Sequence, residues 1–147
     1  MNRFFPTFVE GPGAIGLLIL RLVSGIAFVL HSIPLLEHPT RWMNELHLPS
    51  PAPASVQFLA AFGQFVCGLA ILVGIVTPLA SIALGIIMAG AIFTVHLPRG
   101  DAFVTRPGEP SSELAVLYLA IMVVLLLVGP GTLSLDALFF RRKPSWL

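Results

Sequence analysis

Charged side chains are scarce in this sequence. Its 147 residues include 8 Lys and Arg and 7 Asp and Glu, so only 10% of the residues are charged, against roughly 25% in an ordinary soluble domain. So few charges cannot cover a surface that faces water, which excludes a soluble enzyme and a disordered tail. The formal net charge of +1 also excludes a nucleic-acid-binding protein, because the capture of phosphates needs a basic field.

Cysteine is almost absent as well. The single Cys67 excludes a disulfide framework and an internal dithiol redox pair. Apolar side chains are abundant instead, since 56% of the residues are hydrophobic and the mean hydropathy is +0.95. This composition predicts an integral membrane protein, and a length of about 150 residues predicts one domain over residues 1–147.

Four apolar runs are each close to the roughly 20 residues that a helix needs to cross the ~30 Å hydrocarbon core. They show no alternation with a period of two, so a membrane β-barrel is not expected. The sequence predicts an all-α, integral membrane four-helix bundle, with a short interfacial amphipathic segment after Gly129-Pro130-Gly131. The predicted spans are residues 13–33, 55–76, 79–97 and 113–129. The first is too long for a signal peptide and no A-x-A site follows it, so we expect it to be retained.

Lys and Arg are distributed slightly unevenly between the two predicted sides of the membrane. The side that holds both chain ends carries Arg3 and the run Arg141-Arg142-Lys143, and the other side carries Arg41, Arg99 and Arg106. Basic residues close to the end of a span favour the cytoplasmic side. We therefore expect both termini to lie in the cytoplasm.

Arg21 interrupts the first span, where a charge near the bilayer centre costs from about 3 to more than 10 kcal/mol. Gln64 should reach a similar depth in the second span and could accept a hydrogen bond from the guanidinium. Asp136, just past the fourth span, could form a structural ion pair with Arg21, because a helical side chain points back toward the N-terminus. Glu113 is a third candidate partner. Two interpretations stay open: Arg21 snorkels and fixes helix packing, or it holds an anionic or quinone-like headgroup.

All four histidines lie on the predicted outer side. His31 ends the first span, His96 ends the third, and Glu113 begins the fourth at the same level. These three residues could relay protons, and they are weak candidates for a divalent metal site. Their spacing matches no metal-binding motif, so no metal site is predicted. A haem between His31 and His96 has no supporting motif either.

Small residues form a stripe on the third span, where Ser81, Gly85 and Ala89 recur every four residues. Small side chains at this spacing let two helices approach closely in lipid. We interpret the stripe as a packing face.

Several of these positions, taken in their order along the chain, form a pattern that is typical of a known family. The order runs through Leu20-Arg21-Leu22, Gly25, His31, Gly68, Leu72-Val73-Gly74-Ile75, Thr77, His96, Glu113, Gly129-Pro130-Gly131 and Ser134-Leu135-Asp136. In order and spacing this resembles the DoxX family of small four-helix bacterial membrane proteins, over about Gly16 to Phe140. That family commonly has a glutamate in the second helix, where this chain has Gln64.

The resemblance implies a subunit of a respiratory or redox assembly in the bacterial inner membrane. Family members include subunits named for a terminal quinol oxidase and for thiosulfate:quinone oxidoreductase. We therefore interpret the chain as a membrane subunit in quinone- or thiol-linked redox chemistry that binds a quinone-like molecule within the bundle. The expected ligand-binding residues are Arg21, Gln64, His31, His96, Glu113 and Tyr118.

No catalytic residue is assigned, because no side chain here can transfer electrons without a cofactor or a partner. An accessory subunit of a quinone-linked oxidoreductase therefore fits better than an enzyme that acts alone. A quinone is the first candidate cofactor, ahead of haem or a metal. The expected partners are the lipid bilayer, a soluble or membrane redox protein and a second copy of the chain, but not nucleic acid. Two alternatives stay open: a structural or assembly subunit that docks a soluble partner, and a small metal or solute carrier.

Overall fold

The computed structural model describes residues 8–46, 48 and 50–140, and its regular elements over these residues are all helical. In chain order they are α1 (Pro12–Glu37), the 3-10 helix η1 (Trp42–Leu46), α2 (Ala54–Val73), α3 (Thr77–Ala91), the π-helical segment η2 (Ile92–His96), α4 (Leu97–Arg99), α5 (Glu113–Val128) and α6 (Leu135–Phe140). The predicted all-α class is therefore confirmed. The basic run Arg141-Arg142-Lys143 and the residue Arg3, used above for orientation, lie outside the described residues.

Three stretches of the described chain are long and apolar enough to cross a membrane. They are α1, α2 and the continuous stretch Thr77–Arg99, which joins α3, η2 and α4. The fourth apolar helix, α5, has 16 residues and is therefore only about 24 Å long. Large apolar side chains stay exposed along these helices, as at Ile86 (67%) and Leu127 (78%). Such a surface is stable where lipid covers it, because lipid tails are as apolar as these side chains.

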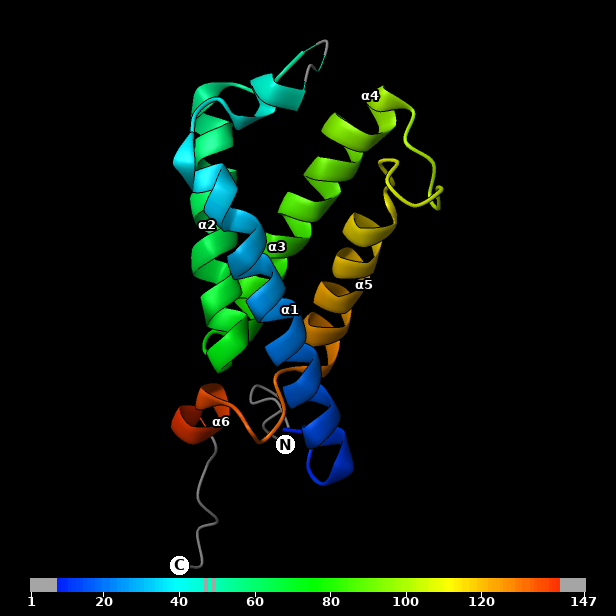
Figure 1. Cartoon of the computed structure of the whole chain (residues 1–147). Coiled ribbons are helices and arrows are strands. Elements are labelled where there is room, and N and C mark those ends of the chain that lie inside the picture. Colours follow the sequence, from blue (N-terminus) through cyan, green and yellow to red (C-terminus); the bar gives the residue numbers. More distant parts are fainter. Residues whose placement is uncertain (1–7, 47, 49, 141–147) are drawn as a thin grey trace, which may run out of the picture.

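The helices pack in the order α1, α2, α3 and α5, and each contacts the next. In Figure 1, α6 lies below the α2–α3 hairpin, at the same end of the bundle as the start of α1. Glycines bring α1 and α2 into close contact. A Cβ on Gly25 would lie 2.8 Å from the Cα of Leu72, and a Cβ on Gly68 would lie 2.9 Å from the Cβ of Phe28.

Two helix boundaries differ from the predicted spans. α1 continues through Pro34 to Glu37, because a proline near a helix end removes one hydrogen bond and its fixed φ still suits the helix. The corner between α2 and α3 lies at Gly74–Val76 rather than at Thr77-Pro78. Gly74 takes the left-handed conformation with φ 71°, and Pro78 stands in the first turn of α3, where its missing N–H costs nothing.

A buried glutamine fixes the loop at the opposite end of the bundle. The Gln57 side chain accepts a hydrogen bond from the backbone N–H of Met43 (3.0 Å) and donates one to the carbonyl of Ala52 (2.7 Å). Its backbone carbonyl accepts from the indole N–H of Trp42 at 3.1 Å. These bonds hold η1 against the first turn of α2, and Met43 packs with Val95 of η2 in a small apolar cluster.

Candidate functional site

A buried arginine lies at the end of the bundle that carries α6. Arg21 of α1 is 1% exposed, and its Nη2 donates a hydrogen bond to the carbonyl of Leu133. Its Nη1 lies beside Gly74, where an added Cβ would be 1.5 Å away. The guanidinium is therefore level with the α2–α3 corner and not with the middle of α2.

The Leu133 carbonyl that accepts from Arg21 belongs to the loop between α5 and α6. Gly129 and Gly131 adopt positive φ values of 81° and 78°, which glycine reaches without steric cost. They turn the chain back across the start of α1, so that Gly131 packs against Leu17. There the N–H of Thr132 donates to the carbonyl of Val9 at 3.0 Å. The Gly-Pro-Gly sequence thus positions the acceptor for Arg21.

Asp136 of α6 caps the N-terminus of α3. Its two carboxylate oxygens accept from the backbone N–H groups of Val76 (2.7 Å) and Thr77 (2.8 Å). Its own N–H donates to the carbonyl of Gly74 at 2.8 Å. Val76 has a positive φ of 49°, which is unfavourable for a β-branched residue, and the carboxylate compensates by satisfying the helix end and its dipole.

Asp136 also supplies the negative charge that faces Arg21, since the two side chains interact electrostatically. The predicted pairing of these residues takes an indirect form. The carboxylate oxygens are bonded to the α3 backbone, and the guanidinium is bonded to the Leu133 carbonyl. Among the described residues no ion pair or hydrogen bond joins the two side chains, so Asp136 acts on Arg21 only through its charge.

Four buried polar atoms at this end of the bundle have no hydrogen-bond partner among the described residues. They are Nε and Nη1 of Arg21, Oγ1 of Thr77 and Oγ of Ser81. Thr77 and Ser81 lie one turn apart on α3, and Arg21 lies against Gly74, three residues before Thr77. Buried donors without acceptors are costly. All of these groups can donate, so the arrangement suits a molecule that presents oxygen acceptors.

The predicted meeting of Arg21 with Gln64 does not occur. The contacts of Gly25 with Leu72 and of Gly68 with Phe28 set the register of α1 against α2. In that register Gln64, although buried, lies about 15 Å along α2 from the position of Gly74. The prediction was wrong because it counted Arg21 and Gln64 from the starts of two spans that enter from opposite sides and assumed that the spans are level, whereas the first turns of α1 extend beyond the hairpin corner.

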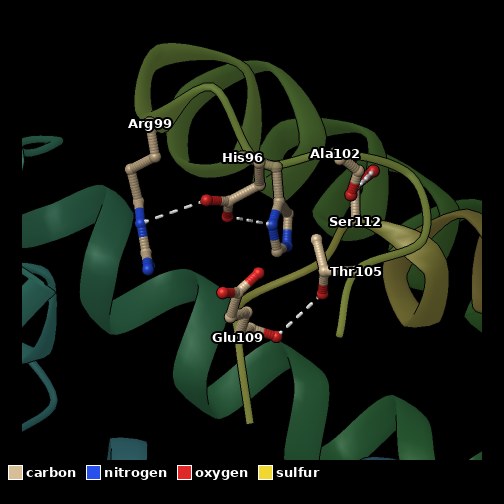
Figure 2. Close-up of polar contacts among 7 residues, drawn as sticks. His96, Arg99, Ala102, Thr105, Glu109 and Ser112 are labelled. Carbon is tan, nitrogen blue, oxygen red and sulfur yellow. Dashed lines mark hydrogen bonds and ion pairs between the residues drawn. The ribbon is translucent and has the colours of Figure 1, made fainter. Parts of the chain in front are cut away.

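The other predicted polar residues lie toward the opposite end. His96, about 28 Å along α3 and η2 from Thr77, donates from Nδ1 to Oδ2 of Asp101 at 2.8 Å. The other oxygen of Asp101 lies 3.6 Å from Nε of Arg99. Figure 2 shows His96 and Arg99 on opposite sides of this carboxylate, with the loop that carries Glu109 nearby. These two contacts attach the beginning of the loop between α4 and α5 to His96 of η2 and to Arg99 of α4.

His31 and Tyr118 approach each other between α1 and α5. Their rings lie 6.2 Å apart, and Tyr118 also packs against Phe28 at 4.8 Å. His31 is exposed and donates to the carbonyl of Ala27 within its own helix. Glu113 is exposed at the first position of α5. Within the part of the chain that the structure describes, His31, His96 and Glu113 form no group that could hold a metal ion.

Sequence reasoning found Arg21 and Asp136 through the cost of burying charge, but it missed the partners around them. Leu133 contributes its backbone carbonyl, and Gly74 makes room for the guanidinium because it has no side chain. Neither role depends on a side chain that could be recognised in the sequence. Thr77 and Ser81 could have been recognised, since two hydroxyl residues four positions apart share a face of α3. In the sequence, Ser81 was assigned to packing alone.

The comparisons with known proteins agree with the membrane fold. A family model described as DoxX matches residues 16–97, more than half of the chain. The match includes Arg21, Gly74, Thr77 and Ser81, and it ends before α5, short of the resemblance that the sequence suggested up to Phe140. A protein of Bacillus subtilis (strain 168) named "Putative oxidoreductase CatD" is 26% identical over 134 residues, which cover 89% of this chain and 92% of that protein. No solved structure matches the chain significantly.

Proposed function

This chain belongs to the DoxX family of membrane proteins, and we propose that it is a redox-associated subunit that holds the headgroup of a quinone-like molecule at Arg21. The observation that carries the proposal is the buried guanidinium, whose Nε and Nη1 find no acceptor in the part of the chain that the structure describes. The word oxidoreductase in the name of the Bacillus subtilis relative supports redox chemistry of this kind.

The charge balance at Arg21 favours a neutral ligand. Asp136 already places one negative charge near the guanidinium, so an anionic ligand would bring a second negative charge into a buried place. A quinone carbonyl accepts hydrogen bonds without bringing a charge. Such an acceptor matches the two free nitrogen atoms of Arg21 and the nearby hydroxyl of Thr77.

The chain itself would bind and orient the quinone, and the electrons would come from a partner protein or another cofactor. The protein is then an accessory subunit in the bacterial inner membrane with both termini in the cytoplasm. In this orientation α6 lies at the cytoplasmic interface. Its exposed side chains Leu138, Phe139 and Phe140 enter the headgroup region as anchors.

The test is to purify the protein in a mild detergent, extract the bound lipids and measure quinones by mass spectrometry, followed by titration with decylubiquinone. We expect bound quinone in the unaltered protein. We expect the affinity for decylubiquinone to fall about tenfold in Arg21→Lys, because lysine keeps the charge but loses the planar set of donors. Arg99→Lys, at the other end of the bundle, is the matched control. An unaltered protein that neither retains quinone nor binds decylubiquinone contradicts the proposal.

A second function, a structural or assembly subunit, is favoured by the backbone contacts of the same residues. Arg21, through Leu133, and Asp136, through Gly74 and Thr77, connect α1, the α2–α3 corner and α6. If this is their whole role, Arg21→Lys lowers the melting temperature. A stoichiometric protein partner then co-purifies without any small molecule.

A further inference from the structure

The last described segment of the chain, residues 129–140, lies against the buried arginine, and we call it the strap. It consists of the loop after α5 and of α6, which lies below the α2–α3 hairpin in Figure 1. The Leu133 carbonyl of the strap accepts from Arg21. Ser134 lies beside Gly74, since a Cβ added to Gly74 would be 2.7 Å from the Cβ of Ser134 and 1.5 Å from Nη1 of Arg21. With the strap in place Arg21 is 1% exposed, so the strap forms one wall of the enclosure around the guanidinium.

This enclosure leaves a ligand no access to Arg21. Nε and Nη1 of Arg21 are buried and find no acceptor among the described residues. The apolar groove between residues 81–89 of α3 and 122–126 of α5 does not lead to them, because neither Arg21 nor Thr77 lines it. A ligand can therefore bond to these nitrogen atoms only after part of the enclosure has moved.

The strap is attached by hydrogen bonds more than by packing. Asp136 and Ala137 are the buried residues of the six in α6, and α6 packs extensively against none of the other described helices. It is held by the bonds of Asp136 to the α2–α3 corner and by the bond of the Thr132 N–H to the carbonyl of Val9. Segments with few buried apolar contacts open at a low cost in free energy. The strap is thus the part of the enclosure that moves most easily.

The backbone of this region is suited to such a movement. Gly129 has φ 81° and ψ −177°, a conformation that glycine adopts and other residues reach only with strain, and Gly131 has a φ of 78°. At the α3 end, the Asp136 carboxylate holds Val76 at its positive φ of 49°. Departure of Asp136 lets Val76 relax, and this relief offsets part of the hydrogen bonding that is lost when the strap opens.

We propose that the strap is a gate, which turns about Gly129 and Gly131 to admit a quinone-like molecule and then closes over its headgroup at Arg21. The inference rests on the proposed function and specifies how the ligand enters. The exposed apolar side chains at the end of α6 stay in the membrane interface during the movement. The molecule therefore enters from the lipid at this end of the bundle.

The first test measures access to Arg21 without any quinone. Phenylglyoxal modifies accessible guanidinium groups, and peptide mass spectrometry of the detergent-purified full chain gives the rate at Arg21, with the exposed Arg41 as the internal standard. Gly129→Ala strains the closed strap, although its Cβ meets nothing within 4 Å. Modification of Arg21 should therefore become about tenfold faster. Gly108→Ala is the matched control, because Gly108 also has a positive φ and open space around it but lies in the loop between α4 and α5.

The second test measures the association and dissociation rates of decylubiquinone. A gate changes both rates equally, because the closed strap is strained to the same extent in the free and the bound protein. We expect both rates to rise about tenfold in Gly129→Ala and the Kd to change by less than about twofold. If Gly129→Ala does not fold, Ser134→Ala replaces it. It removes the hydroxyl that accepts from the Ala137 N–H at 3.1 Å, and the loss of this cap should raise the modification rate of Arg21 and both quinone rates about threefold.

The outcomes separate the gate from the proposed function. If decylubiquinone binds but Arg21 is modified no faster in Gly129→Ala and Ser134→Ala than in the unaltered protein, the gate alone is overturned. The gate is also overturned if modification accelerates while both quinone rates stay unchanged, because the ligand then enters by another route. If decylubiquinone does not bind the unaltered protein, the proposed function fails and the gate for a quinone fails with it.

Discussion

Arg21 and Gly74 lie so close together that any side chain at residue 74 would occupy the place of the guanidinium. A Cβ on Gly74 would be 1.5 Å from Nη1 and 2.8 Å from Cζ of Arg21. The same glycine ends α2 in the left-handed conformation. One residue thus forms the hairpin corner and makes room for the buried charge.

Replacement of Gly74 by alanine should destabilise the protein by about 2–4 kcal/mol, because the new Cβ meets Arg21 and the positive φ becomes strained. The free energy of unfolding in mixed micelles of detergent and SDS measures the effect. The matched control is Gly16→Ala in α1, where an added Cβ meets nothing within 4 Å. Equal stability of the two variants would show that Arg21 does not lie against Gly74.

Arg21 and Asp136 should be energetically coupled, although each is bonded to backbone atoms. Asp136→Asn removes the negative charge that faces Arg21 and one of the two acceptors for the α3 backbone, and Arg21→Met removes the buried positive charge. Because each single change leaves the other charge uncompensated, the double variant should be less destabilised than the sum by about 1–3 kcal/mol. The same unfolding measurement on all four proteins gives this coupling. Strictly additive effects would mean that the two charges do not interact.

Asp101 should control the order of the 98–112 connection with little effect on the bundle. Its carboxylate is 4% exposed and contacts His96 of η2 and Arg99 of α4, so Asp101→Ala removes the side-chain contacts that join the loop to these two segments. We expect limited proteolysis within residues 98–112 to become several-fold faster, with a loss of only about 1 kcal/mol in overall stability. Glu109→Gln is the control, because Glu109 bonds Thr105 through its backbone carbonyl. Unchanged cleavage in Asp101→Ala would contradict this role.

The sequence predicted the helices well because hydrophobic length is a local property. Three of the apolar runs correspond to α1, α2 and the continuous helical stretch Thr77–Arg99, and the fourth corresponds to the shorter α5. The glycines after the fourth run form the loop that leads to α6. The sequence placed the hairpin corner three residues too late. Pro78 looked like the break, but proline is well accommodated in the first turn of a helix.

The depth of Arg21 could not be read from the sequence in the same way. It depends on how far α1 is displaced along α2, and the contacts of Gly25 with Leu72 and of Gly68 with Phe28 set that displacement. Counting residues from the start of each predicted span placed Gln64 at the depth of Arg21. Close packing at two glycines placed Gly74 there instead.

By itself, the sequence determined that this is a helical membrane protein, because so few charges and so much apolar surface are stable only in lipid. It also determined that Arg21 needs a partner, because a charge within an apolar span is costly, and it offered Asp136 as one candidate. Only the tertiary structure decided which atoms lie around Arg21, and which donors of Arg21, Thr77 and Ser81 find no acceptor among the described residues. Hydrogen bonding depends on a few tenths of an ångström and on the relative positions of several segments, and no local pattern of residues contains that information.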